Sequence, residues 1–554
     1  MLGANPRTAF ARSLTRVLVL GGYGGFGGRI SQRLAAAGHE VIVAGRNEAK
    51  ARVFCGGDPA LVPALVDRVA VAKALAEHRP DTLVDASGPF QALDHVVPRA
   101  CIEAGVNYLD IADGRAFVCG IAGLDAAAKA AGVIVISGAS SVPALSGAVV
   151  RQLTAGMTRV DAVEMAISAS NRAAAGPAVA ASILSQTGQT LRVWLGRRWT
   201  TCFGWQSLER VRFEIEGQCP IAGRLVGLVD VPDLELLPAR LPGRPAIVFR
   251  AGTELTFQNL ALWFASWPVR WRIVRSLIPF ARLLRPLQRL TAKLGSDRSA
   301  MVVRVFGRIG DKRLERRWTL IANDGDGPEI PTLSIVPLVA RIVEGSEPPG
   351  ARDAGQCLSL TDYQPAFDRL SIVSQTSDYG ASSPLYARVM GTDFDRLPSS
   401  VRAMHDVLRD GGASGSAKVT GASSPVATLI ARMIGFPREG TYAAHVHFIE
   451  RDGVERWTRT FGEHSFQSEL SQRGGCLVER FGSLRFAFDL ALNLDGLTMV
   501  MRRWWLGPLP MPLALAPRSP AREWEESGRF HFDVPITLPL IGTLVHYRGW
   551  LEKS

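Results

Sequence analysis

Residues 17–47 read VLVLGGYGGFGGRISQRLAAAGHEVIVAGRN. The apolar run at 17–20 predicts a buried parallel strand, and residues 29–37 have the periodicity of an amphipathic helix. Gly38 is placed to end that helix, and residues 41–44 form a second apolar run. This order of strand, glycine-rich turn, helix and strand is typical of the first unit of a doubly wound α/β sheet.

The glycines of the turn follow the spacing G-x-G-x-x-G, at Gly22, Gly24 and Gly27. In this pattern the first glycine makes the turn, the second lets the backbone approach a pyrophosphate, and the third lets the helix pack closely on the strand. The helix N-terminus adds free N–H groups and the positive end of a dipole. We therefore expect a bound dinucleotide, held by a loop that consists of Gly22, Tyr23, Gly24, Gly25, Phe26 and Gly27. The alternative is a glycine-rich turn in another kind of α/β protein.

The end of the second strand indicates which nucleotide is bound. An NAD site usually carries Asp or Glu there, to accept a hydrogen bond from the ribose 2′-hydroxyl. Here the strand ends Ala44-Gly45-Arg46-Asn47, without an acid. A guanidinium suits the 2′-phosphate of NADP, because it can bind the phosphate with two hydrogen bonds. Arg46 therefore predicts NADP rather than NAD, the alternative being a solvated surface arginine.

Length and composition limit the class of protein. The chain has 554 residues, 47% apolar and 21% charged, which is too long for one core and suggests about three domains. Lys and Arg exceed Asp and Glu by 63 to 51, a formal charge of +12. The excess is dispersed and is not interleaved with stacking aromatics, so we expect no nucleic-acid partner. It fits an anionic cofactor or an anionic membrane surface better.

Seven scattered cysteines without a C-x-x-C pair predict neither a disulfide framework nor a zinc site, and favour a reduced cytoplasm. The first sixteen residues lack the apolar region of a secretory signal. No uninterrupted apolar stretch reaches the roughly 20 residues that cross a bilayer. We expect a cytoplasmic protein, with membrane association at its surface as a further alternative.

The alternation of strands and helices continues to residue 150. Strands are expected at 61–66, 81–86, 106–111 and 133–137, and helices at 69–78, 95–104 and 124–131. Ser87, Gly88, Pro89 and Phe90 follow directly on the strand that ends near residue 86. In a doubly wound sheet, ligands lie at the carboxyl ends of the strands. Residues 1–150 are therefore predicted to form a dinucleotide-binding (Rossmann) domain.

Five segments together resemble the saccharopine dehydrogenase-like oxidoreductases: GGYGGFG, AGR, DTLVDASGPF, ACIEAGVNYLDIADG and GVIVISGASSVPALSG. The similarity covers residues 15–150 well and continues more weakly to about 365. It implies that Gly22, Gly24, Phe26 and Gly27 form the phosphate loop, that Arg46 contacts the adenosine phosphate, and that Ser87 to Phe90 form the wall near the nicotinamide. One departure is Ala112-Asp113-Gly114-Arg115, where many relatives have glycine followed by glutamate.

The remaining chain divides by composition. Residues 151–330 predict an α+β substrate or dimerisation domain, and 331–370 a return to the nucleotide domain. Residues 371–425, rich in Gly and Ser, predict a linker with a helix. Residues 426–554 predict an antiparallel β-rich domain with a helix at its start, because successive short strands are joined by turns such as Asp452-Gly453. This last part resembles an uncharacterised domain family that is fused behind saccharopine dehydrogenase-like domains.

The segment 255–294 interleaves tryptophans with arginines. Trp263, Trp267 and Trp271 lie among arginines that include Arg282 and Arg285. Aromatic anchors beside arginines are typical of a helix that lies on an anionic membrane. The favoured alternative is a helical lobe that packs on its own domain or on a second subunit of a homodimer.

The sequence gives only weak evidence for a metal site or for a particular catalytic proton donor. His445, His447 and His464 would suit zinc, but no acid or cysteine is placed beside them by spacing, so we expect no metal. Proton donors near a nicotinamide are sought among Tyr108, Asp110, Asp113 and Ser140, and the stretch from Ser140 to Pro143 offers either hydroxyls or a helix cap. None of these residues sits in a local catalytic constellation, and the catalytic acid–base stays unassigned.

The sequence thus predicts an α/β protein with an inserted α+β domain and a C-terminal antiparallel domain. The expected function is an NADP-dependent oxidoreductase that transfers a hydride to or from a C=O, C=N or activated C=C bond of an unidentified, apolar small molecule. The alternative is a non-catalytic nucleotide-binding or membrane-associated interaction protein, with the C-terminal domain as a lipid-binding module.

Overall fold

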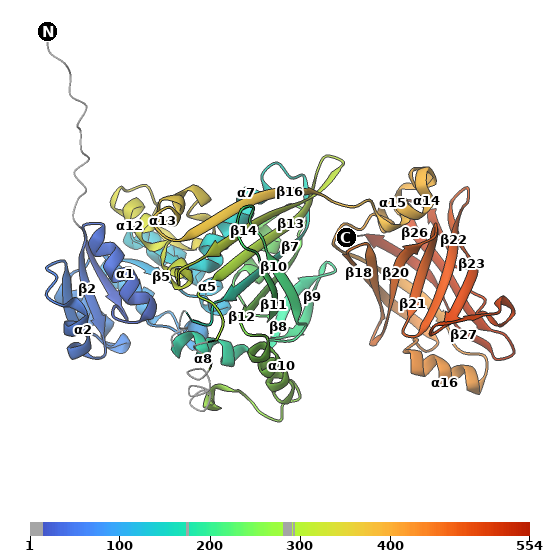
Figure 1. The fold of residues 1–554 in the computed structure, drawn as a ribbon, viewed down its shortest axis with the longest axis horizontal. Helices are drawn as coiled ribbons and strands as arrows, with labels where there is room; N and C mark the ends of the chain where they lie inside the picture. Colours follow the sequence, from blue (N-terminus) through green and yellow to red (C-terminus); the bar gives the residue numbers. More distant parts are fainter. Residues whose placement is uncertain (1–14, 173–176, 281–290, 292–293, 554) are drawn as a thin grey trace, which may run out of the picture.

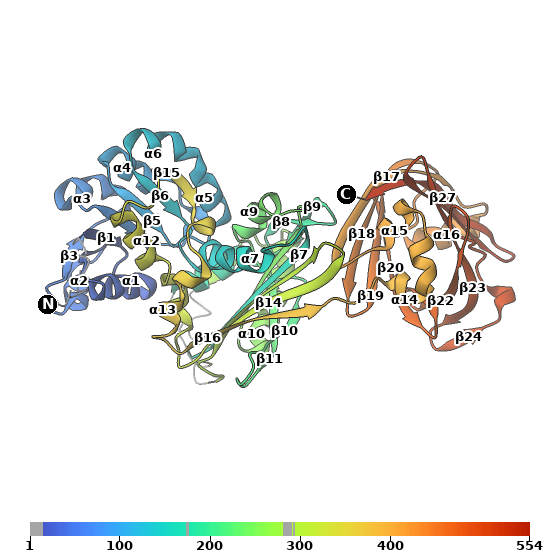
Figure 2. The ribbon, with the colours of Figure 1, turned by 90° about the horizontal axis from the view of Figure 1, so that it is seen from above.

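Three bodies lie in a row along the long axis of the molecule (Figures 1 and 2). The computed structural model describes residues 15–553 except for 173–176, 281–290 and 292–293. The first body is the nucleotide-type domain, the second is built on a mixed sheet, and the third is a sheet closed on itself. The expected fold class is confirmed in each of these parts.

The first body contains a seven-stranded parallel sheet. Its strands, in spatial order, are β15 (Gly350–Asp353), β6 (Ile134–Ser137), β5 (Asn107–Asp110), β4 (Thr82–Asp85), β1 (Arg16–Leu20), β2 (Glu40–Gly45) and β3 (Leu61–Leu65). Helices α1 (Gly25–Ala36), α2 (Glu48–Cys55), α3 (Val71–His78), α4 (Val96–Ala104), α5 (Arg115–Gly120) and α6 (Asp125–Ala131) connect them. The strands read as apolar runs because helices cover both faces of the sheet.

The direction in which strands are added reverses between β1 and β4. The chain goes from β1 outward to β2 and β3, and then crosses back to β4 on the other side of β1. In a doubly wound sheet such a switch point opens the crevice where a ligand binds. The seventh strand, β15, comes from far along the chain and pairs with β6, while α12 (Ile335–Val343) packs against α1.

The second body is an α+β domain. Its sheet has the order β10 (Glu209–Phe213), β11 (Ile221–Leu228), β12 (Ala246–Thr253), β7 (Arg159–Ala169), β13 (Ser299–Ile309), β14 (Lys312–Ala322) and β16 (Ile372–Gly380). Added to it are the hairpin of β8 (Thr190–Leu195) and β9 (Arg198–Phe203), and the helices α7 (Ser146–Thr154), α8 (Pro177–Gln186), α9 (Asp233–Arg240) and α10 (Thr256–Arg270). One hydrophobic core continues from the first body into this one.

The third body is an antiparallel sheet with a core of its own. Its strands are β17 (Asp410–Thr420), β18 (Gly440–Arg451), β19 (Val454–Phe461), β20 (His464–Arg473), β21 (Cys476–Phe481), β22 (Leu484–Leu492), β23 (Gly496–Leu506), β24 (Leu509–Met511), β25 (Arg522–Glu526), β26 (Arg529–Leu538) and β27 (Gly542–Lys553). Pairing of β22 with β23 closes the sheet. Helices α14 (Leu385–Met390), α15 (Ser399–His405) and α16 (Pro425–Ile434) pack on it.

The prediction of a linker at 371–425 is wrong at both ends of that range. Residues 372–380 form β16, which pairs with β14, and residues 410–420 form β17, which pairs with β18 and β27. The glycines of β17 mark close backbone contacts: a Cβ on Gly415 would lie 2.0 Å from the carbonyl oxygen of Trp550. A Cβ on Gly412 would lie 2.0 Å from the carbonyl oxygen of Gly196. Amino-acid composition alone does not distinguish glycines that allow close backbone contact from glycines of a flexible linker.

A buried ionic cluster joins the second and third bodies. The carboxylate of Glu164, on β7, accepts two hydrogen bonds of 2.8 Å from the guanidinium of Arg409, just before β17. Arg304 and Arg451 lie 3.6 and 3.5 Å from the same carboxylate. Burial raises the pKa of Glu164, but the nearby guanidinium charges, that of Arg409 first, outweigh burial and lower this pKa to about 2. The buried, desolvated ion pair of Glu164 and Arg409 therefore joins the closed sheet to the second body.

Candidate active site

The glycine loop between β1 and α1 folds tightly on itself. The amides of Gly21 and Gly22 both donate to the carbonyl oxygen of Ala44, at 2.8 and 3.0 Å. A Cβ on Gly27 would lie 2.1 Å from the carbonyl oxygen of Gly21, and a Cβ on Gly22 would lie 2.7 Å from that of Val19. Only glycine fits at these two positions, so the loop brings the start of α1 against the end of β1.

The N-terminus of α1 faces the switch point between β1 and β4. Gly24 is its N-cap residue, no side chain caps the helix, and its first turn contains no acidic residue. The first amides of a helix have no partner inside the helix. An anion placed at the switch point would therefore meet free N–H groups and the positive end of the dipole.

Tyr23 joins the loop to the end of β2. Its ring covers Gly45, where a Cβ would lie 2.4 Å from a ring carbon, and its hydroxyl accepts a hydrogen bond of 2.9 Å from the amide of Asn47. Between these two contacts lies Arg46, whose side chain is exposed. Over the described part of the chain, no hydrogen bond or ion pair is recorded for its guanidinium. This guanidinium is therefore available to an anionic group at the end of β2.

The carboxyl end of β4 carries a buried polar cluster. Asp85, the last residue of β4, is fully buried and is paired with the guanidinium of Arg68, which follows β3. The same guanidinium donates to the hydroxyl of Ser87 at 2.9 Å, and that hydroxyl donates to Asp85 at 2.6 Å. Sequence reasoning missed Arg68 and Asp85, although both follow or end predicted strands at the same sheet edge. Phe90 is buried against Phe117, with ring centroids 5.3 Å apart.

A cavity of about 290 Å³ opens between the first and second bodies. The first body contributes Gln91, Ala92, Gly114, Arg115 and Ala116, and the second Ser185, Gln186, Gln189, Thr190, Leu191 and Asp230. Gln91 follows β4 and Gly114 follows β5, so this cavity lies at the carboxyl edge of the sheet, as the glycine loop does. We call it the interdomain pocket. Seven of its eleven lining residues carry amide, hydroxyl or charged side chains, and the other four are alanine, glycine or leucine.

Asp113 contacts the lining of the interdomain pocket through Gln91. Its carboxylate accepts hydrogen bonds from the side chains of Gln91, at 3.0 Å, and Ser182, at 3.3 Å. Burial raises the pKa of Asp113. Arg115, two residues on, donates to Asp230 at 3.0 Å and also pairs with Glu235. The segment at 112–115 therefore contributes Gly114 and Arg115 to the lining of this pocket.

The other proton-donor candidates lie away from the pocket. Tyr108 and Asp110 are fully buried within the sheet. Asp110 accepts from the amides of Ala112 and Gly138, at 2.9 and 2.7 Å, and burial raises its pKa to about 6. Ser140 is also buried, and its side chain makes no helix-capping bond. Among the four candidates, Asp113 alone contacts a residue that lines the pocket.

The histidines expected on one strand face do share it. His445 Nδ1 lies 2.9 Å from the hydroxyl of Ser414, and His447 Nε2 lies 2.7 Å from Asp410. Burial, more than the nearby positive charges, lowers the pKa of His445 to about 4. His464 lies on β20, beside the ring of Tyr442. Each of the first two imidazoles is thus engaged by a neighbour on β17.

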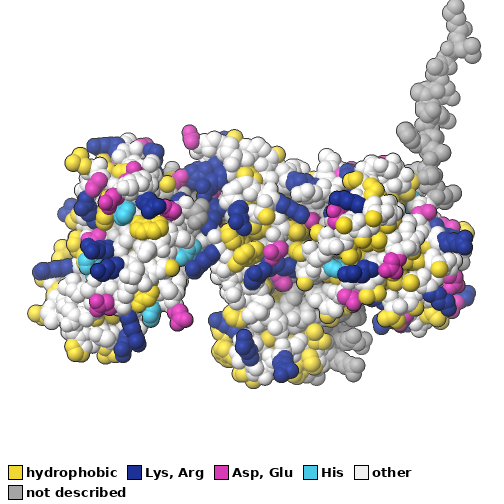
Figure 3. Space-filling view, turned by 180° about the vertical axis from the view of Figure 1, so that it is seen from behind, with side chains coloured by type: hydrophobic (Ala, Val, Ile, Leu, Met, Phe, Trp, Pro, Cys, Tyr) yellow, Lys and Arg dark blue, Asp and Glu magenta, His cyan; other side chains and the backbone are white. Residues whose placement is uncertain are grey.

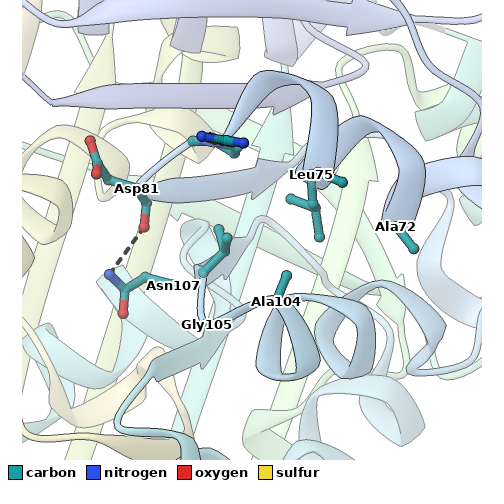
Figure 4. Close-up of a pocket in the computed structure, with 10 residues that line it drawn as sticks. Ala72, Leu75, Asp81, Ala104, Gly105 and Asn107 are labelled. Carbon is teal, nitrogen blue, oxygen red and sulfur yellow. Dashed lines mark hydrogen bonds between the residues drawn. The ribbon is translucent and has the colours of Figure 1, made fainter.

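A larger cavity of about 610 Å³ lies at the opposite edge of the parallel sheet (Figure 4). Its lining includes Ala72, Leu75, Asp81, Ala104, Gly105 and Asn107, and Asn107 Nδ2 donates to the carbonyl oxygen of Asp81 at 3.2 Å. This is the amino edge of β4 and β5, whereas ligands of such sheets bind at the carboxyl edge. The larger cavity is therefore not assigned to the dinucleotide.

Two family models match the chain. Residues 17–136 match the saccharopine dehydrogenase NADP binding domain, and residues 397–551 match a domain of unknown function (DUF4166). No curated protein matches the chain in sequence. Within the described ranges, no helix combines the length and the apolar character needed to cross a bilayer.

Several solved structures are similar to this chain at low sequence identity. Saccharopine dehydrogenase (L-Glu forming) from Saccharomyces cerevisiae is 13% identical, with a TM-score of 0.45, over 66% of this chain and 100% of that one. Homospermidine synthase from Legionella pneumophila, in complex with NAD, is 12% identical, with a TM-score of 0.42, over 67% and 92%. Amine dehydrogenase from Mycobacterium smegmatis is 14% identical, with a TM-score of 0.36, over 62% and 95%.

Proposed function

Residues 17–136 form a nucleotide-binding domain of the saccharopine dehydrogenase-like family, and from this premise we propose that the chain is an NADP-dependent oxidoreductase. It transfers a hydride between the nicotinamide and a C=O, C=N or activated C=C bond of a small molecule. The observation that carries the proposal is a shared sheet edge. The glycine loop, the wall at Ser87 to Phe90 and the interdomain pocket all lie at the carboxyl ends of the parallel strands.

The residues at this edge fit the parts of the cofactor. The amides at the start of α1, with the loop from Gly22 to Gly27, would hold the pyrophosphate, because glycines at 22, 24 and 27 let the backbone approach it closely. Arg46 would take the 2′-phosphate, since its guanidinium is exposed at the end of β2. Ser87, Gly88, Pro89 and Phe90 would border the nicotinamide. When bound, the nicotinamide supplies or accepts the hydride, and the protein supplies orientation.

The interdomain pocket is the proposed substrate site. Its amides and hydroxyls suit a substrate with hydrogen-bonding groups, and the carbon surface between them suits an apolar part of the same molecule. Asp113, with a raised pKa and a hydrogen bond to pocket-lining Gln91, is the proposed source of the proton that accompanies hydride transfer. A homodimer and a cytoplasmic location remain predictions.

Replacing Arg46 by alanine tests the choice of cofactor. We expect the dissociation constant for NADPH to rise about ten- to a hundredfold, because a charge-assisted hydrogen bond to a phosphate is worth about 1.5–3 kcal/mol. The affinity for NADH should stay the same, because NADH has no 2′-phosphate. Isothermal titration of both nucleotides measures the two constants.

Arg52→Ala is the matched control for that substitution. Arg52 is another exposed arginine of the same region, but it is already paired with Glu48 on α2. Its loss should leave both dissociation constants unchanged. Equal affinity of the unmodified protein for NADH and NADPH would refute the NADP preference and leave a general dinucleotide site.

A further inference from the structure

Helix α10 presents its apolar side to solvent. The side that faces the protein contains Asn259, Ser266 and Val269, which are buried. The opposite side carries Phe257, Leu260 and Phe264, at the spacing of one helical face, and Phe264 is 65% exposed. A surface helix of a globular protein normally has the reverse arrangement. The apolar face of α10 is therefore available to a binding partner rather than to the chain's own hydrophobic core.

The exposed apolar surface continues past the end of α10. Trp271 is 62% exposed, and Ile273, Ile278 and Phe280 are exposed as well. With the three side chains of the helix these residues form what we call the α10 patch: Phe257, Leu260, Phe264, Trp271, Ile273, Ile278 and Phe280. Several large apolar side chains exposed along one helix and the segment after it are typical of an interaction site. The rest of the predicted Trp/Arg segment, at 281–290 and 292–293 with Arg282 and Arg285, lies outside the described residues.

Three arginines lie at the C-terminal end of α10 and directly after it. Arg270, Arg272 and Arg275 are exposed. Arg270 donates to Gln206 and lies over the ring of Trp267, 5.0 Å from its centroid. For Arg272 and Arg275, no side-chain hydrogen bond or ion pair is recorded in the described ranges. At the lower end of the second body, Figure 3 shows hydrophobic and basic side chains together.

A second exposed apolar helix lies in the third body. On α16, Val426, Leu429 and Met433 follow one helical face, and the latter two are 61% and 80% exposed. Leu540 is fully exposed on the β26–β27 turn, whose residue Ile541 accepts a hydrogen bond from Ser424 beside α16. We call Val426, Leu429, Met433 and Leu540 the α16 patch. Arg432 and Arg438 are exposed beside it, together with Glu439.

The helices that carry the two patches lie on the same side of the molecule in the view of Figure 1. In Figure 1, α10 is at the lower edge of the second body and α16 is at the lower edge of the third. The ionic cluster around Glu164 and Arg409 joins these two bodies. A single flat surface could therefore meet both patches at once.

From this arrangement we propose that the α10 and α16 patches seat the protein on an anionic phospholipid membrane. The tryptophan and phenylalanine side chains enter the interface between headgroups and acyl chains, and the arginines pair with lipid phosphates. The membrane, rather than a second copy of the chain, is the favoured occupant for two reasons. First, a planar surface can contact two patches that lie on separate bodies. Second, arginines outnumber carboxylates at the borders of both patches.

The patch also lies close to the proposed substrate site. Gln189, which lines the interdomain pocket, donates from its side chain to the carbonyl oxygen of Arg275 at 2.7 Å. Gly188 lies against α10, where a Cβ would come 2.4 Å from the carbonyl oxygen of Ser266. On the membrane, the pocket would therefore stand beside the lipid surface. This last point rests on the proposed function, whereas the docking itself does not.

Vesicle flotation of the full chain tests the docking. We expect the protein to float with vesicles of phosphatidylcholine and 30% phosphatidylglycerol, and to stay at the bottom with phosphatidylcholine alone. The double variants Phe264→Ser/Trp271→Ser and Leu429→Ser/Met433→Ser should each reduce binding at least tenfold. The double variant Arg272→Gln/Arg275→Gln should reduce it about thirtyfold, since each cation near an anionic surface contributes about a factor of five.

Matched controls remove similar groups from the first body. Val53 and Val69 are 82% and 87% exposed there, so Val53→Ser/Val69→Ser removes comparable apolar surface. Lys73→Gln/Arg99→Gln removes two exposed charges. Both control variants should float like the unmodified protein. Melting temperature and NADPH binding, measured on every variant, report folding and the proposed function separately from docking.

Three outcomes would overturn the proposal. One is an unmodified protein that does not float with anionic vesicles. Another is flotation that the patch variants leave unchanged. The third is a dimer in sedimentation equilibrium, without flotation, that the patch variants dissociate, which would assign the surface to a second copy of the chain.

Discussion

A chain with Gly27 replaced by alanine is expected to lose NADPH binding by at least a hundredfold and to melt at a lower temperature. The added Cβ would lie 2.1 Å from the carbonyl oxygen of Gly21, with further backbone atoms of residues 21 and 22 at 2.8 and 3.1 Å. Backbone cannot swing aside as a side chain can, so α1 must move away from β1. Such overpacking costs about 1–3 kcal/mol or more, and the displaced helix no longer aims its amides at the pyrophosphate. Calorimetry gives the melting temperature and titration gives the affinity.

Gly25→Ala is the control within the same loop. A Cβ on Gly25 would meet nothing within 4 Å, and Gly25 is the first residue of α1. Alanine restricts the unfolded chain more than glycine does, so this variant should be as stable as the unmodified protein or more stable by about 0.4–1 kcal/mol. Its melting temperature is therefore the control for the steric effect of the Cβ added at Gly27. Normal binding by the Gly27 variant would mean that the loop does not hold the cofactor.

Glu164→Ala is expected to destabilise the chain by about 3–5 kcal/mol. The substitution leaves the guanidinium of Arg409 buried between two bodies without its partner, while Arg304 and Arg451 lose a shared carboxylate. Urea unfolding should show the loss, with the closed sheet separating from the second body at a lower concentration. Glu48→Ala is the control, because the Glu48–Arg52 pair is exposed and should change stability by less than about 1 kcal/mol.

Glu164 also makes the stability of the folded protein depend on pH. Because the pKa of Glu164 is lowered in the folded protein, to about 2, its carboxylate stabilises the fold above the ordinary glutamate pKa. This contribution, about 3 kcal/mol, should disappear progressively as the pH falls from about 4.5 toward 2. Glu164→Gln should lack that part of the pH profile. An identical acid profile for the variant and the unmodified protein would show that Glu164 is not paired as described.

The nucleotide-type domain could be predicted from sequence because its signals are local. Strands buried on both faces read as apolar runs, and the glycines at 22 and 27 stand where backbone meets backbone. Arg46 could be singled out because the second strand ends at a fixed distance from the loop. The pairing of Arg68 with Asp85 could not, since those residues come from different strands and meet only at the folded edge.

The interdomain pocket was beyond sequence reasoning for the same reason. Gln91, Ser185 and Asp230 lie far apart in the chain, and no periodicity connects them. The glycines of β17 predict a linker by composition, but composition does not report how closely two backbones approach in a folded sheet. The Trp/Arg segment left two alternatives open, and the outward face of α10 is a property of packing that the sequence pattern of that helix does not contain.

The strand β15 has a consequence for how the protein is made. It completes the parallel sheet by pairing with β6, but the ribosome delivers it roughly 200 residues after β6, about 10–40 s later at ordinary rates of synthesis. Throughout that interval the edge of β6 is unpaired, and an open edge is a template for association with other chains. The yield of native protein should therefore depend on elongation speed and on chaperones that shield the nascent sheet. A truncated gene that ends after β6 would leave that edge open permanently.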